Sequence, residues 1–73
     1  MAAPAAVVRV TVNGEPRELP AGATVADVVA RLAAPGRPCA VEVNREIVPR
    51  SAHAGRLLNE GDQVEVVHAL GGG

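Results

Sequence analysis

The chain of 73 residues is long enough for one small domain, and its formal net charge of −1 does not indicate a nucleic-acid partner or an anionic membrane surface. It has no aromatic residue, so aliphatic side chains must fill the core and no base can stack on an aromatic ring. A single cysteine excludes an intramolecular disulfide, and no apolar run is long enough to span a bilayer. Residues 1–6 lack the charged and apolar regions of a signal peptide, so we interpret them as a flexible extension of a cytoplasmic protein.

The first predicted element is a β-hairpin. In residues 7–12 valines alternate with polar residues, which is typical of a strand with one buried face. Asn13-Gly14 follows, and this pair is the strongest short hairpin signal. We expect residues 15–16 to lengthen the turn and residues 17–19 to return as a short second strand.

A helix is expected after this hairpin. Thr24 and Asp27 resemble a capping box, in which the threonine accepts a hydrogen bond from a free backbone N–H and the acidic residue is favoured in the first turn. Apolar residues then recur at helical spacing and form one stripe. The residues of that stripe are Val25, Val28, Val29, Leu32 and Ala33. Two prolines within residues 35–38 end the helix, because proline cannot continue it.

Two further strands are predicted after the helix. Residues 39–43 form the third strand, and Asn44 and Arg45 turn the chain. Residues 46–49 form a short strand, and Pro49 indicates that this strand lies at an edge of the sheet, because proline cannot donate a hydrogen bond to a neighbour.

A loop and a last strand complete the domain. Residues 51–59 are predicted to be irregular, with Leu57 and Leu58 anchored in the core, and residues 60–62 form a turn. Strands on one side of a single helix indicate an α+β layer pair. A mixed sheet wrapped around that helix fits the order of the elements, and we see no internal repeat or linker.

The last ten residues combine a strand with a run of glycines. In the first part of residues 64–73, β-branched residues alternate with Glu65 and His68, as in a strand. Residues 71–73 are all glycine, and glycine lacks a Cβ, so such a tail is thin and mobile. It could enter a channel that excludes side chains and deliver a carboxylate for adenylation. A frayed end is the alternative interpretation.

Several short motifs occur in a characteristic order. They are Val12-Asn13-Gly14-Glu15, Ala23-Thr24-Val25, residues 40–51, residues 61–67 and Gly71-Gly72-Gly73. With this ordered set the chain resembles the ThiS family, the ubiquitin-like sulfur carrier proteins of thiamine biosynthesis. It departs from the family pattern at His53, near which members commonly have an aromatic residue. It also has residues 1–6 before the first strand, where members usually begin.

The resemblance implies a β-grasp fold, with a mixed sheet of four to five strands wrapped around one helix. It divides the chain into a flexible extension (1–6), a sulfur carrier domain (7–70) and a C-terminal glycine tail (71–73).

The resemblance also implies that the chain is a protein substrate and not an enzyme. In the family, a ThiF-like adenylyltransferase uses ATP and magnesium to form an acyl-adenylate on the terminal glycine. Sulfur from a donor such as a cysteine desulfurase then replaces AMP, and a ThiG-like thiazole synthase accepts it from the thiocarboxylate. By this resemblance Gly73 is the modified residue, and Gly71 and Gly72 pass through the channel. No cofactor bound by the carrier itself is expected, and no nucleic-acid or membrane partner.

Three alternatives remain open from the sequence. The small subunit of molybdopterin synthase shares the fold and the terminal Gly-Gly, but it tends to have a proline-containing approach to the tail, whereas this chain has Val67-His68-Ala69-Leu70. A ligand-binding β-grasp module without covalent chemistry is the second alternative. A conjugated modifier like ubiquitin is the third.

Individual residues are predicted as follows. Cys39 is expected to be a small buried hydrophobic residue. His68 should be packed or at the rim of the core, and His53 should be solvated; two distant histidines are too few for a metal site. Strand alternation places Val67 on the face opposite the core, so Val67 and Leu70 are candidates for a partner-docking patch.

Overall fold

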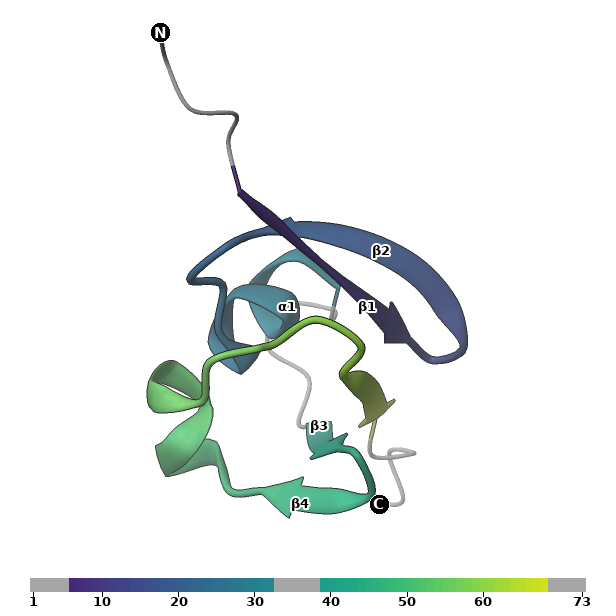
Figure 1. The fold of residues 1–73 in the computed structure, drawn as a ribbon. Coiled ribbons are helices and arrows are strands. Elements are labelled where there is room, and N and C mark those ends of the chain that lie inside the picture. Colours follow the sequence, from purple (N-terminus) through teal and green to yellow (C-terminus); the bar gives the residue numbers. More distant parts are fainter. Residues whose placement is uncertain (1–5, 33–38, 69–73) are drawn as a thin grey trace, which may run out of the picture.

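The computed structural model describes residues 6–32 and 39–68. In this part of the chain five strands form one sheet beside one α-helix, which confirms the α+β class and the mixed sheet (Figure 1). The elements are β1 (Val7–Val12), β2 (Glu15–Pro20), α1 (Val25–Leu32), β3 (Cys39–Val43), β4 (Glu46–Val48), the 3₁₀ helix η1 (Arg50–Gly55) and β5 (Gln63–His68).

The last strand lies in the middle of the sheet. The strand order is β2-β1-β5-β3-β4, so β5, yellow-green in Figure 1, separates the two hairpins. It runs parallel to β1 and antiparallel to β3, whereas both hairpins are antiparallel. β4 is an edge strand, as Pro49 indicates.

Both hairpins close with two-residue turns. Asn13 and Gly14 have φ values of 51° and 83°, and Asn44 and Arg45 have values of 52° and 70°. Such positive φ angles match the twist of the strands that the turn joins. The expectation that residues 15–16 lengthen the first turn is wrong, because Val12 pairs directly with Glu15 and β2 begins there.

The capping box at the start of α1 is confirmed. The backbone N–H of Thr24 donates to Asp27 Oδ2 at 2.9 Å, and the backbone N–H of Asp27 donates to Thr24 Oγ1 at 3.3 Å. Val25 and Val28 are fully buried. Leu32 is 37% exposed, however, since helical spacing fixes the side of the helix on which a residue lies but not whether another element covers it.

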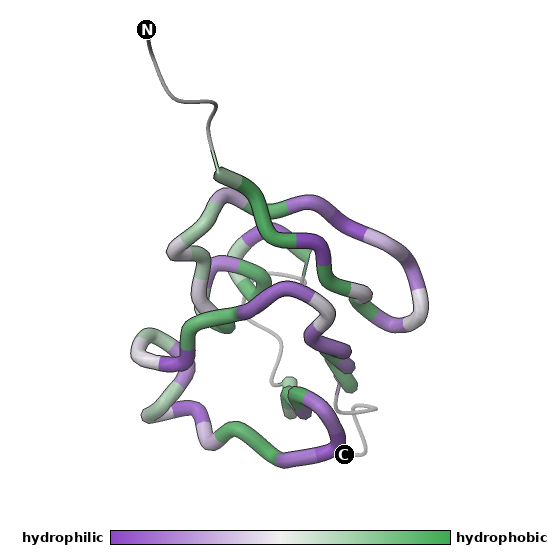
Figure 2. Tube along the Cα trace, viewed as in Figure 1, coloured by the Kyte–Doolittle hydropathy of each residue, from purple (hydrophilic) through white to green (hydrophobic). Residues whose placement is uncertain are grey.

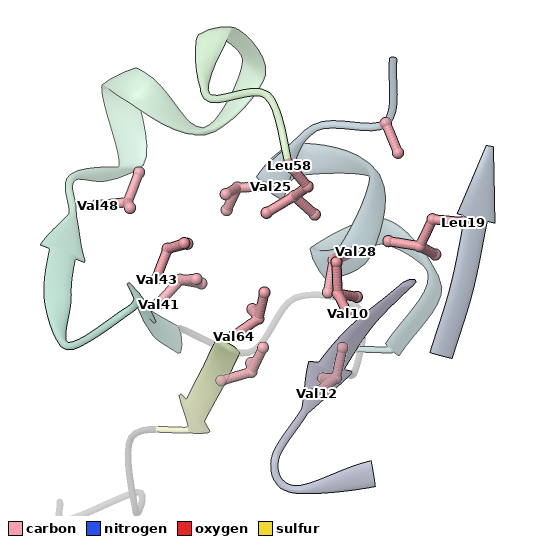
Figure 3. Packing of buried hydrophobic residues seen from close by; sticks show 12 residues of the cluster. Val10, Val12, Leu19, Val25, Val28, Val41, Val43, Val48, Leu58 and Val64 are labelled. Carbon is pink, nitrogen blue, oxygen red and sulfur yellow. The ribbon is translucent and has the colours of Figure 1, made fainter. Parts of the chain in front are cut away.

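The core lies between α1 and one face of the sheet. In Figure 3, side chains from α1, from the strands and from Leu58 point toward one another. Hydrophobic and hydrophilic residues alternate along β1 (Figure 2), which gives the strand one buried and one open face. The buried hydrophobic residues are Val10, Val12, Leu19, Ala23, Val25, Val28, Val41, Val43, Val48, Leu58, Val64 and Val66. Ala33 and residues 35–38, which we expected to extend and end the helix, lie outside the described residues.

Two expectations for the segment between β4 and β5 are wrong. Leu57 is 54% exposed, because it forms an isolated antiparallel bridge with Thr24, and in extended chain the side chains of Leu57 and Leu58 point to opposite sides. His53 is not solvated but buried, at 8% exposure. It lies in η1, a helical turn that the sequence did not predict, and its Nε2 is 3.1 Å from the Val48 carbonyl, which accepts the hydrogen bond.

Candidate functional site

The candidate site is the C-terminal end of β5, which leads to the glycine run. Val64 and Val66 point into the core, whereas Val67 is 55% exposed on the opposite face, as strand alternation predicts. His68 is half-buried at the rim of the core and pairs with Cys39, which packs against the core. Leu70 and the predicted tail residues Gly71, Gly72 and Gly73 lie outside the described residues.

Neighbouring strands hold β5 unequally on its two sides. On one side β3 pairs with β5 as far as His68. On the other side the pairing with β1 covers fewer residues, because its register ends at Val12 and Val64. The side chain of Asn13 continues the contact: its Oδ1 accepts a hydrogen bond from the Val66 N–H at 2.8 Å, and its Nδ2 is 3.4 Å from the Val66 carbonyl.

A cluster of polar side chains around Asp62 holds the beginning of β5. Asp62 is buried, and its Oδ2 accepts a hydrogen bond from the Asn59 N–H at 2.8 Å. Its Oδ1 accepts one from Asn44 Nδ2 at 3.0 Å, and Arg56 Nη1 lies 3.9 Å from Oδ2. Asn44 Oδ1 in turn accepts a hydrogen bond from the Gln63 N–H at 2.9 Å.

Sequence reasoning missed these polar contacts. We interpreted Asp62, Asn13 and Asn44 only as turn residues. The contacts of Asn13 and Asn44 join residues 18 to 53 positions apart, which no local pattern reveals. The available signal was the repetition of asparagine at the first position of both hairpin turns.

The open face of the sheet carries apolar and acidic side chains beside the end of β5. Ile47 on β4 is 73% exposed. It lies opposite Glu42 on β3, and Glu42 lies opposite Glu65 on β5. Val67, on β5, is the second exposed apolar residue here. Like charges directly opposite each other in a sheet are destabilising, by about 0.2–1 kcal/mol.

The described residues offer little for small-molecule chemistry. None of them form a group of three or more His, Cys, Asp or Glu side chains that could hold a metal ion. An open pocket of about 250 Å³ lies between the end of β2 and α1, and its charged lining residues are Asp27 and Arg31. Pro20 pairs with Val7, so this pocket is at the opposite end of β1 from the candidate site. No helix in the described ranges has the length and apolarity to cross a membrane.

Comparisons with known proteins agree with the observed fold and with the resemblance of the sequence to the ThiS family. The ThiS thiamine biosynthesis protein of Geobacter metallireducens has a solved structure that matches with a TM-score of 0.76 at 30% identity, covering 90% of this chain and 100% of that one. Thiazole synthases of Paramagnetospirillum magneticum and Magnetococcus marinus are 42% and 38% identical over 65 residues. Those matches cover 89% of this chain but only 20% of each relative, so the chain spans about a fifth of the length of these curated relatives. The model of the ThiS family matches residues 10–73, which is nearly the whole chain, and the protein therefore belongs to the ThiS family.

Proposed function

We propose that the chain is the sulfur carrier for formation of the thiamine thiazole. The observation that carries the proposal is the family match, which runs from β1 through Gly73 and so includes the glycine run. The similarity to a ThiS structure over 90% of the chain supports it. The proposal makes the chain a carrier and not an enzyme, and it places the chain in the cytoplasm, where ATP is available.

The proposed chemistry takes place at the carboxylate of Gly73. A carboxylate oxygen attacks the α-phosphorus of ATP in a ThiF-like adenylyltransferase that uses magnesium, and pyrophosphate leaves. A sulfur nucleophile then attacks the acyl carbon and AMP leaves, which gives a thiocarboxylate. Hydrosulfide is the simplest such nucleophile; a persulfide from a cysteine desulfurase also requires a thiol that reduces the resulting acyl disulfide.

The geometry of β5 is compatible with this delivery. Gly73 is five residues beyond His68, the last residue of β5, and five extended residues span up to about 17 Å. The glycines at 71 and 72 add no side-chain bulk next to the reacting carbon. A carrier domain held outside an enzyme could therefore place Gly73 in a nucleotide site inside it.

A ThiG-like thiazole synthase is the proposed acceptor of the sulfur. Two proteins named thiazole synthase each contain a segment similar to this chain within a polypeptide about five times as long as the match. The presence of both parts in one polypeptide supports a functional association between them. It favours the thiazole pathway over that of molybdopterin synthase.

The direct test follows the mass of the protein. Its intact mass before reaction shows whether Gly73 carries a free carboxylate. Incubation with ATP, magnesium, sulfide and the ThiF-like enzyme should then replace one oxygen by sulfur. Deletion of Gly73, or addition of one alanine after it, should abolish this change, and Gly72→Ala should slow it severely.

These tail variants should keep the circular-dichroism spectrum and the thermal midpoint of the parent. Efficient thiolation of the alanine-extended protein would show that the carrier assignment is wrong. The chain would then be better described as a non-covalent β-grasp module.

The docking surface for the activating enzyme is proposed to include Val67 and Leu70. Val67→Asp places a charge on the open face, where it removes an apolar contact, and should weaken binding without unfolding the domain. Leu57→Asp is the matched control, because Leu57 is equally exposed, at 54% against 55%, but lies in the segment that bridges to Thr24. Equal affinities of the two variants, measured by calorimetry, would remove Val67 from the interface.

A further inference from the structure

The two hairpin-turn asparagines hold β5 in a similar way from its two sides. Asn13 and Asn44 each occupy the first position of a two-residue turn, with φ values of 51° and 52°. The backbone N–H of Asn13 donates to the Val64 carbonyl at 2.9 Å, and that of Asn44 donates to the Gln63 carbonyl at 2.8 Å. The side-chain oxygen of each then accepts a hydrogen bond from a backbone N–H of β5.

The two contacts differ in their distance from the candidate site. Asn44 binds Gln63, the first residue of β5, where Asp62 also holds the strand. Asn13 binds Val66, two residues before the end of β5 and beyond the last β1 pair. Asn13 therefore extends the contacts on the β1 side of β5 toward the C-terminal end of the strand.

We propose that Asn13 is a positioning residue for the carrier reaction, through the pair of hydrogen bonds from its side chain to the backbone of Val66. This inference rests on the proposed function. With Asn13 in place, β5 is held on both sides at Val66, and β3 continues the pairing on its own side at Val67 and His68. Without this side chain, the β1 side of β5 is held only as far as Val64. The end of the strand then samples more conformations in the free carrier. Fixing it in one conformation on an enzyme costs conformational entropy, which weakens binding.

The test compares Asn13→Gly with Asn44→Gly. Glycine keeps the turn possible in both, since it accepts positive φ, and both variants lose two side-chain hydrogen bonds to residues 62–66. Both should therefore lower the thermal midpoint. Only Asn13→Gly should reduce the heteronuclear ¹⁵N NOE of the Val67 and His68 amides in the free carrier.

The kinetic measurement is pyrophosphate release by the ThiF-like enzyme at a temperature where all variants are folded. Asn13→Gly should raise the KM for the carrier about tenfold, which corresponds to ordering about one additional backbone residue. Its kcat should stay near the parental value, because the ordering is complete once the carrier is bound. Asn44→Gly should leave both constants unchanged, which separates positioning from a general loss of stability.

Asn13→Asp provides the conservative variant. Aspartate suits the same turn and keeps an acceptor for the Val66 N–H, but it has no donor for the Val66 carbonyl. Its KM should lie between those of the parent and Asn13→Gly, and it replaces Asn13→Gly if that variant fails to fold.

Two results would overturn the inference. One is an equal rise in KM for Asn13→Gly and Asn44→Gly, and the other is an unchanged NOE at Val67 and His68 in Asn13→Gly. Failure of the parent protein to be adenylated would instead contradict the proposed function. In that case the NOE comparison still decides whether Asn13 fixes the end of β5.

Discussion

His53 and Asp62 are buried polar side chains whose hydrogen bonds hold the segment between β4 and β5 against the rest of the domain. Both are buried, and each has a partner: the Val48 carbonyl for His53, and the Asn59 N–H and Asn44 amide for Asp62. Among the described residues, no buried side-chain nitrogen or oxygen lacks a hydrogen-bond partner. Because an unpartnered buried polar group is destabilising, this pairing lets a polar segment cover the core.

At the residue scale, His53→Ala should lower the free energy of unfolding by about 2 kcal/mol. The substitution removes a packed ring from the core and the hydrogen bond to Val48. Urea denaturation measures the change, and Ser51→Ala, at an exposed position in the same 3₁₀ helix, is the control. Equal urea midpoints for the two variants would contradict the structural role given to His53.

At the scale of elements, α1 depends on its first turn. Most of the stability of a helix in a protein comes from the packing of its apolar face, so the two buried valines and the capping box hold α1 in place. The reciprocal bonds between Thr24 and Asp27 satisfy two backbone N–H groups. They also fix the direction in which the chain enters the helix from β2.

Asp27→Ala should therefore lower the stability by about 1 kcal/mol, the usual contribution of a cap. Asp27→Asn keeps an oxygen that can accept from the Thr24 N–H and should lose less. Thermal unfolding of both variants separates the hydrogen bond from the charge. A loss for the asparagine variant close to that of the alanine variant would show that the carboxylate charge at the helix N-terminus stabilises α1 more than the hydrogen bond does.

Local patterns predicted the individual elements well. Valine alternation identified β1, Asn13-Gly14 identified the first hairpin, and the Thr24–Asp27 spacing identified the start of α1. Each signal operates within a few residues. The turn length, the 3₁₀ helix and the side on which Leu57 lies were not predicted. The first two are local features that the residue pattern did not distinguish from irregular chain, whereas the side on which Leu57 lies depends on its bridge to the distant Thr24.

The candidate site was likewise predicted only where a local rule applies. The exposure of Val67 follows from strand parity, a local rule, and the structure confirms it. The contacts of Asn13 and Asn44 with β5 required the strand order, which the sequence does not contain in any single window. The role of Gly73 stays a prediction, which the mass measurement tests.

At the scale of the whole molecule, the absence of lysine restricts what the chain can be joined to. All seven basic residues are arginine, so a second copy has no internal lysine amine that could attack the acyl carbon of an activated Gly73. Incubation with ATP and the activating enzyme should therefore give no self-conjugate through an internal residue. Peptide mass spectrometry would locate such a linkage, and finding one would contradict this prediction.

The central position of β5 also determines when the domain can fold. The contact between Asn13 and Val66 closes a separation of 53 residues, so the sheet cannot be completed until Val66 has left the ribosome. At a synthesis rate of about 5–20 residues per second, β1 has an unpaired edge for roughly 3–10 s before β5 is available to pair with it. Long-range pairing of this kind slows folding and leaves strand edges open to other chains in the meantime. Newly made protein therefore has a brief period of exposure to aggregation, which ends when β5 inserts between the two hairpins.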